Sequence, residues 1–495
     1  MIIFGVALSV FAVLVVGLLV ARKVDGDSTN FLVAGRTLAL PLSAAGLMGQ
    51  AVDSNATLGN TDLSAGFGFW AGVSLPFGLG VCLLLTGLFF ARRMNAMRIL
   101  TLPDFYRRVY GRGVEVVASI LMIFSFCILL AGNLVAGGLL FEAFLGTSSE
   151  LGIVLIVGVV LTYTITGGMF SDAYTAFLQM CITVTASATL LVWVWARYGL
   201  SSPDGMGPFD LGQLSDPAQG AVVNWGTLLA LGIGDIVAID FMQRIFSAKS
   251  PDVARRACFV GAAGTALVGI PYGLVALSSA GIFGDDEVSG PVLFHLLDNY
   301  APVWLAILVL SGIVAASCST ANGAILGTAA VAVRNVAGFG RQLSTDGHDP
   351  LLRSVRATMI PVVAIAVFFA IRVPETGILL TLAFDLMLAC LTVPFVLGHY
   401  WSRSTREAAI AAIAVGFVVR LTLFAMTPTI FGADNTLWYV ENDLVGAGFD
   451  GYPTLLGALA SLVAFVAVAL VTRRAEPIDL GPVEEPAAAR EAAAA

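Results

Sequence analysis

Apolar residues dominate this chain in long runs that recur from one end to the other, with short polar stretches between them. A helix of about 20 apolar residues crosses a hydrocarbon core of about 30 Å. The pattern therefore predicts an all-α polytopic membrane protein. We expect about thirteen transmembrane helices, near residues 2–21, 40–65, 68–91, 114–145, 150–168, 174–198, 222–246, 254–282, 301–334, 355–372, 376–400, 405–428 and 452–472.

Composition agrees with this prediction and narrows the function. The chain is 58% hydrophobic and only 12% charged, whereas a soluble domain carries about twice that charge. A net charge of −8 argues against nucleic acid as a partner. The loops have no room for a soluble catalytic domain, and the nucleotide-binding P-loop pattern does not occur, so we do not expect an enzyme.

Positive charge is distributed unevenly between the loops. Lys and Arg cluster after alternate spans, and the set includes Arg92, Arg93, Arg244, Lys249 and Arg403. The loops on the other side, 199–221, 283–300 and 429–451, contain no Lys or Arg. Because cytoplasmic loops carry the positive excess, this bias predicts a plasma (inner) membrane protein with its N-terminus outside and its C-terminus in the cytoplasm.

Two predicted spans carry acidic and amide side chains, which an ordinary apolar membrane helix lacks. The first, at 40–65, contains Asp53, Asn55 and Asn60, and Gly59 and Gly66 loosen the helix nearby. An ionisable group at bilayer depth usually faces a cavity or a partner. Unwound backbone survives there only where protein or water satisfies its polar groups.

The second interrupted span, at 222–246, holds close glycines followed by Asp235 and Asp240. Two interrupted, acid-bearing helices at matching places in two halves of a chain are typical of an inverted repeat with the binding site between them. Glycines that merely allow close helix packing are the alternative explanation. The paired carboxylates in both halves favour a binding site.

Four segments resemble the sodium:solute symporter family, most closely its choline and proline carrier branches. They are TLPDFYRRVYG at 101–111, YTITGGMFSDAYTAFLQ at 163–179, DFMQRIFSAKSPDVARRA at 240–257 and AASCSTANGAILGTAAVAVRNV at 315–336. The resemblance implies a leucine-transporter-type fold, a five-plus-five inverted repeat with two broken helices. It divides the chain into an extra N-terminal helix and cytoplasmic loop (1–39), a transport core (40–400), extra C-terminal helices (401–474) and a tail (475–495) that we expect to be disordered.

The resemblance also implies a sodium site between the first broken helix and the predicted span 301–334. Its ligands would be Ala51, Ser54, Ala316, Ser319 and Thr320. Positions 316, 319 and 320 share one helical face, which agrees with this assignment. The alternative is that Ser319 and Thr320 hydrogen-bond back to their own helix.

One position departs from the family pattern. Where the motif that ends at Gln179 should carry an acid, this chain has Ala176. In family members that use two sodium ions this acid helps to bind the second ion, so one coupling sodium is expected here. Asp172 lies four residues earlier, about 5.4 Å along a helix, which is too far for a simple replacement.

The remaining polar residues of the spans are candidates for solute binding or coupling. They are Asp53, Asn55, Asn60, Asp235 and Asp240. Asp53 either raises sodium affinity through its charge or is a protonated, hydrogen-bonded carboxyl. Asp385 and Arg420 are expected to balance each other's charge inside the bundle. The tryptophan of the choline branch falls near Ala238, so an aromatic cage for a quaternary amine is incomplete.

The sequence thus predicts a sodium-coupled secondary symporter that imports a small organic solute by alternating access. Amino acids, amines (including quaternary amines) and urea-like solutes are the solute classes that fit. The expected partners are this solute, one sodium ion and the lipid bilayer; the oligomeric state stays open. A membrane sensor module or an uncoupled uniporter of the same fold is the alternative function.

Overall fold

The computed structural model describes residues 2–284, 286, 288, 290–339, 349–372, 376–473, 480 and 481. Almost all of this is helix. The tail predicted at 475–495 lies outside the described residues except for Leu480 and Gly481. The only β-strands among the described residues are β1 (Thr429–Ile430) and β2 (Ala433–Asp434), which form a short antiparallel hairpin.

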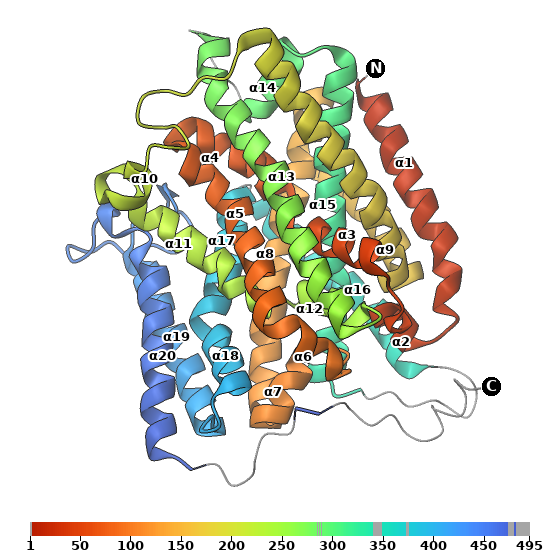
Figure 1. Cartoon of the computed structure of the whole chain (residues 1–495), viewed down its shortest axis with the longest axis vertical. Helices are drawn as coiled ribbons and strands as arrows, with labels where there is room; N and C mark the ends of the chain where they lie inside the picture. The colour runs from red at the N-terminus through yellow and green to blue at the C-terminus, as the bar shows by residue number, and fades with distance from the viewer. Residues whose placement is uncertain are drawn as a thin grey trace.

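The α-helices form one bundle (Figure 1). In order they are α1 (Ile2–Val20), α2 (Ser28–Val33), α3 (Leu40–Ala51), α4 (Asn60–Phe67), α5 (Phe69–Leu85), α6 (Ala91–Ala96), α7 (Pro103–Tyr110), α8 (Arg112–Leu145), α9 (Ser149–Tyr198), α10 (Gly212–Ser215), α11 (Ala221–Gly232), α12 (Ile239–Ser247), α13 (Pro251–Phe283), α14 (Val292–Asn299), α15 (Val303–Val331), α16 (Pro350–Arg372), α17 (Thr376–Met387), α18 (Val393–Tyr400), α19 (Arg406–Met426) and α20 (Tyr452–Val471).

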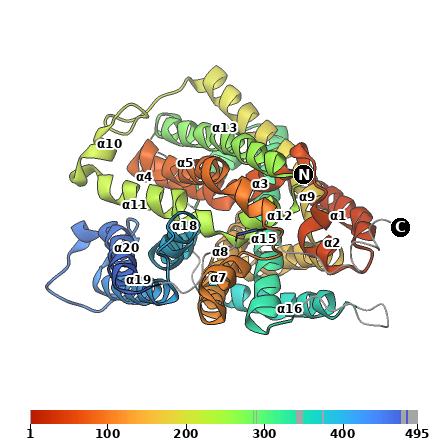
Figure 2. The same ribbon diagram turned by 60° about the horizontal axis from the view of Figure 1, so that its bottom comes forward.

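The helices that carry the polar segments lie at the centre of this bundle. In both Figure 1 and Figure 2, α3, α12 and α15 lie in the interior, while α1 and the pair α19 and α20 lie at opposite edges. Every residue of α15 from Val309 to Val331 is buried, which fits a helix surrounded by other helices on all sides. Apolar side chains on the outer helices remain exposed, as a surface that faces lipid requires.

Among the described residues, ten helices are long and apolar enough to cross a membrane, and eleven if the bent pair α11 and α12 counts as one span. The expected count of thirteen stays a prediction. It further requires the broken α3 and α4 to form one span and the 50-residue α9 to hold two.

Gly168 divides α9 where the sequence predicts a loop between two spans. Its backbone has φ 49° and ψ −135°, a conformation that side-chain-bearing residues rarely adopt. A Cβ at this position would also lie 2.4 Å from the Phe31 carbonyl oxygen, so the loop packs tightly against α2.

The loops predicted to be positively charged meet at one end of the bundle, where Figure 1 shows α2, α6 and α7 at the bottom. Arg36 donates to the carbonyls of Arg98, Ile99 and Phe246, which join three of these loops. Leu38 pairs with Ala248 in an isolated β-bridge. These contacts place the segments that follow the first, third and seventh predicted spans at the same end of the bundle.

Candidate functional site

The first broken helix is interrupted by an aspartate rather than by a glycine. α3 ends at Ala51, and Val52 adopts an extended backbone with φ −104° and ψ 90°. Helical structure resumes as a π-helix, η3 (Asn55–Gly59), which continues directly into α4. The break lies at Val52 and not at Gly59 or Gly66: Gly59 has helical angles at the end of the π-helix, and Gly66 lies within α4.

Asp53 caps the second half of this helix. Its Oδ1 accepts from the backbone N–H groups of Asn55 (3.0 Å) and Ala56 (2.9 Å), two of the donors that a helix N-terminus leaves unpaired. Its Oδ2 accepts from the side-chain amides of Asn55 (2.5 Å) and Asn133 (3.2 Å). Four N–H donors thus hold this buried carboxylate, which makes it part of the break itself.

Asn133, on α8, is a site residue that the sequence analysis did not identify. Its Oδ1 accepts from the hydroxyl of Ser54 at 3.1 Å, while its amide N–H donates to Asp53. The break is therefore fastened to a neighbouring helix through both residues. An asparagine inside the apolar run of 114–145 was the available signal.

The end of α3 meets the middle of α15, as the sodium-site prediction requires. The Thr320 hydroxyl donates to the Gly49 carbonyl at 3.0 Å, and the Gln50 amide donates to the Ser319 carbonyl at 2.9 Å. Ala316 is buried one turn before Thr320 and accepts a longer bond from its hydroxyl. Thr320 therefore bonds across to α3 as well as back to its own helix.

Gly49 lets α3 and α15 approach closely at this crossing. A Cβ at Gly49 would lie 2.4 Å from the Ser319 hydroxyl oxygen and 3.5 Å from the Cβ of Ala176. The motif position that lacks its acid, Ala176, therefore lies beside the same point of α3 as Ser319. Ser54, by contrast, turns its hydroxyl toward α8 rather than α15.

Several polar atoms around this crossing are buried without a hydrogen-bond partner in the described part of the chain. They include Ser319 Oγ, Gln50 Oε1, Asn322 Nδ2 and both amide atoms of Gln179. Buried polar groups are rarely left unpaired in native proteins, so a cluster of them indicates a place for water, an ion or a solute.

The second broken helix consists of α11, the short 3₁₀ turn η6 (Gly234–Val237) and α12, with a bend of 47°. Gly234 permits this bend to pack closely, because a Cβ there would lie 2.6 Å from the Phe384 carbonyl oxygen on α17. Asp235 lies in the turn, and Asp240 lies in the first turn of α12. The prediction that this acid-bearing span is interrupted is confirmed.

Asp235 is a buried acid at the second helix break. Its Oδ1 has no hydrogen-bond partner among the described residues. It lies close enough to Asp53 and Asp240 to interact with both electrostatically. The two helix breaks thus bring carboxylates from both halves of the chain into one region, where a positive charge would be stabilised.

Arg244 is not a loop residue that marks the cytoplasmic side, as the charge pattern suggested. Its side chain is 1% exposed, and its Nη2 donates to Asp172 Oδ1 at 2.6 Å. Its Nη1 donates to the Asp240 carbonyl at 2.9 Å. Asp172 is held through Oδ1 by this ion pair, while its Oδ2 has no hydrogen-bond partner among the described residues.

The other candidates have contacts that fix the fold. The Asn60 amide donates to the carbonyls of Ala56 and Gly269, and its oxygen accepts from Ser64, so it ties α4 to α13. The side-chain amide of Asn55 donates to the Asp53 carboxylate. Asp385 and Arg420 form a buried ion pair, which confirms the expected charge balance.

Comparison with known proteins places these features in context. The model of the sodium:solute symporter family matches residues 31–416, more than half of the chain. The high-affinity choline transporter 1 of Drosophila melanogaster is 23% identical over 438 residues, 84% of this chain and 70% of that protein. The osmoregulated proline transporter OpuE of Bacillus subtilis is 25% identical over 503 residues, 96% and 95% of the two chains.

Solved structures show the same fold. A Na⁺-coupled sialic acid symporter, captured substrate-bound and outward-open, superposes with a TM-score of 0.75 at 15% identity and covers 98% of this chain and 99% of its own. Mhp1, a nucleobase-cation-symport-1 family transporter, superposes with a TM-score of 0.55 at 14% identity, over 90% and 94% of the two chains. The two superpositions support the fold, and the family match supports the class of protein.

Proposed function

Because this chain belongs to the sodium:solute symporter family, we propose that it couples sodium entry to the import of a small organic solute by alternating access. The observation that carries the proposal is the contact between the broken α3 and α15. Thr320 and Gln50 tie these helices together, and the unpaired Ser319 hydroxyl lies at the same crossing.

The proposed sodium ligands are Ala51, Ser54, Ala316, Ser319 and Thr320. Backbone carbonyls at a helix break and hydroxyls on a facing helix are the oxygen donors that a hard cation prefers. The Ser54 hydroxyl is directed toward Asn133 on α8 and away from α15, so its contribution to the ion would be its carbonyl oxygen. Asp53 would not contact the ion but would attract it as a fixed negative charge, and the same carboxylate caps the helix after the break.

One sodium per cycle is proposed. Ala176 offers no oxygen beside Ser319, and Asp172 is engaged by Arg244. A second ion at this point would therefore lack the carboxylate that offsets its loss of water.

The proposed solute carries a positively charged nitrogen, as amino acids and amines do. Asp235 supports this assignment, because it is buried, has an oxygen without a partner among the described residues and interacts electrostatically with two further acids. The similar proteins named as choline and proline transporters handle nitrogen-bearing solutes, which agrees with it.

A binding screen tests the solute class. Purified protein in sodium is expected to gain thermal stability with amines or amino acids, and less with sugars of similar size. Asp235→Asn should weaken binding of the stabilising solute roughly tenfold or more, since it removes a charged partner. Asp62→Asn is the matched control, because that carboxylate accepts from the Val292 N–H instead. Equal loss in both variants would contradict the assignment to Asp235.

A further inference from the structure

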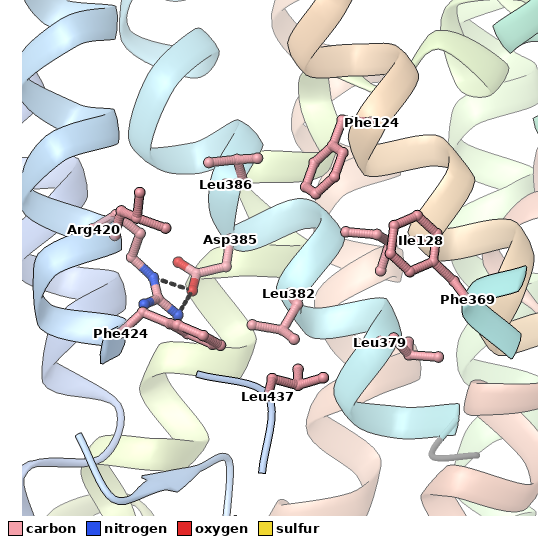
Figure 3. Close-up of a pocket in the computed structure, with 11 residues that line it drawn as sticks. Phe124, Ile128, Phe369, Leu379, Leu382, Asp385, Leu386, Arg420, Phe424 and Leu437 are labelled. Atoms are coloured by element: carbon pink, nitrogen blue, oxygen red, sulfur yellow. Dashed lines mark hydrogen bonds and ion pairs between the residues drawn. The ribbon is translucent and has the colours of Figure 1, made fainter. Parts of the chain in front are cut away.

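A lateral cavity lies away from the helix breaks, between α8, α16, α17 and α19 (Figure 3). It has a volume of about 260 Å³, and its walls are almost entirely aliphatic and aromatic side chains. Leu379 on α17 is buried in it, whereas Phe124 on α8 and Leu437 after α19 are 49% and 43% exposed. The cavity thus reaches the outer face of the bundle, where membrane-spanning helices meet acyl chains.

One polar group lines this apolar cavity, the buried ion pair between Asp385 and Arg420. Nε and Nη2 of Arg420 both point at Asp385 Oδ2, as the dashed lines in Figure 3 show. Nη1 of Arg420 and Oδ1 of Asp385 have no hydrogen-bond partner among the described residues. The pair therefore retains one donor and one acceptor, although both side chains are more than nine-tenths buried.

This combination restricts the chemistry of an occupant. The ion pair is already neutral, so a charged group would be left uncompensated in an apolar wall. A hydroxyl can accept from Nη1 or donate to Oδ1, whereas a hydrocarbon chain alone can do neither. The apolar walls favour a hydrocarbon chain and disfavour a small polar solute.

We propose that this cavity binds a hydroxyl-bearing, single-chain glycerolipid from the surrounding bilayer, with monoacylglycerol as its simplest form. The chain lies among Phe124, Ile128 and Phe369, and a glycerol hydroxyl bonds the Asp385–Arg420 pair. The occupant would hold α17, which packs against η6 of the second broken helix, to the outer helix α19. This proposal does not depend on the identity of the ion or of the solute.

Photolabelling of the purified full-length protein tests the proposal. The probe is a monoacylglycerol with a photoreactive group in the middle of its chain, incorporated into phosphatidylcholine vesicles with the protein. Wild type should be labelled on α8 and α16, which carry Phe124, Ile128 and Phe369. Leu382→Trp, which fills the cavity, should lower this labelling about tenfold, whereas Leu462→Trp on the exposed face of α20 should not.

The hydroxyl is tested with the methyl ester of the same photoreactive fatty acid. It keeps the chain but lacks a donor for Asp385 Oδ1, so it should label about tenfold less. Ile128→Phe repeats the filling from the opposite wall if Leu382→Trp does not fold. Labelling unchanged by either filled variant would show ordinary contact with surrounding lipid and overturn the proposal. Protection by the transported solute would assign the cavity to the transport pathway and overturn it as well.

Discussion

Gly49 and Ser319 show how single residues shape the proposed ion site. The absence of a side chain at Gly49 lets α3 approach α15 until their polar atoms meet, and an added Cβ would collide with the Ser319 hydroxyl. That hydroxyl is buried and unpaired, whereas the neighbouring Ser317 hydroxyl donates to the Ile313 carbonyl of its own helix at 3.1 Å. Two serines two positions apart therefore offer different chemistry.

This difference yields a matched pair of variants. Ser319→Ala and Thr320→Ala should each raise the sodium concentration for half-maximal uptake about 10- to 150-fold, because an oxygen bound to a charge contributes about 1.5–3 kcal/mol. Ser317→Ala on the same helix should leave sodium dependence unchanged. The measurement is solute uptake as a function of sodium concentration. Wild-type sodium dependence in both Ser319→Ala and Thr320→Ala would refute the site.

At the scale of elements, the sequence was sufficient to locate both broken helices but not the mechanism of the first break. Glycine content is a weak guide to where a helix ends, since tertiary contacts override it. Asp53 caps η3, and Asn133 holds Asp53 to α8 from a position 80 residues further along the chain. No local pattern connects the two, because only the folded bundle brings them together.

The misassigned Arg244 has the same cause. Counting charges near span ends treats each arginine as a loop residue, but this one enters the bundle to meet Asp172, 72 residues away. Space for its guanidinium depends on Gly323 of α15, where a Cβ would lie 2.6 Å from Nη2. The sodium-site helices were foreseeable from the motifs, whereas these long-range polar partners were not.

Asp53 as a helix cap predicts the behaviour of a second set of variants. Asp53→Ala removes acceptors for two backbone and two side-chain donors, so thermal stability should fall by more than the roughly 1 kcal/mol of an ordinary cap. Sodium affinity should fall with it. Asp53→Asn keeps one acceptor oxygen and should be milder.

Asp27→Ala is the control, because Asp27 caps α2 through the N–H groups of Thr29 and Asn30, away from the helix breaks. It should reduce stability and leave sodium dependence intact. Equal effects of Asp27→Ala and Asp53→Ala on sodium dependence would mean that Asp53 acts only through stability.

For the whole molecule, the distribution of positively charged loops predicts the orientation of the protein in the membrane. The end that holds Arg36, Arg98 and Lys249 should face the cytoplasm, because positive loops remain on that side. In a chain without its native cysteines, Ser402→Cys should be labelled by an impermeant thiol reagent only after the membrane is opened. Ser202→Cys should be labelled in intact cells. The reverse pattern would invert the proposed topology.

The most direct test of sodium-driven import is solute uptake by proteoliposomes with and without an imposed sodium gradient. One charge moving through 100 mV yields about 2.3 kcal/mol, and a tenfold sodium gradient adds about 1.4 kcal/mol. With one sodium per cycle, a solute of zero net charge should accumulate up to several hundred-fold, and potassium in place of sodium should abolish accumulation. Uptake that only equilibrates the solute, at the same rate in either cation, would contradict the account.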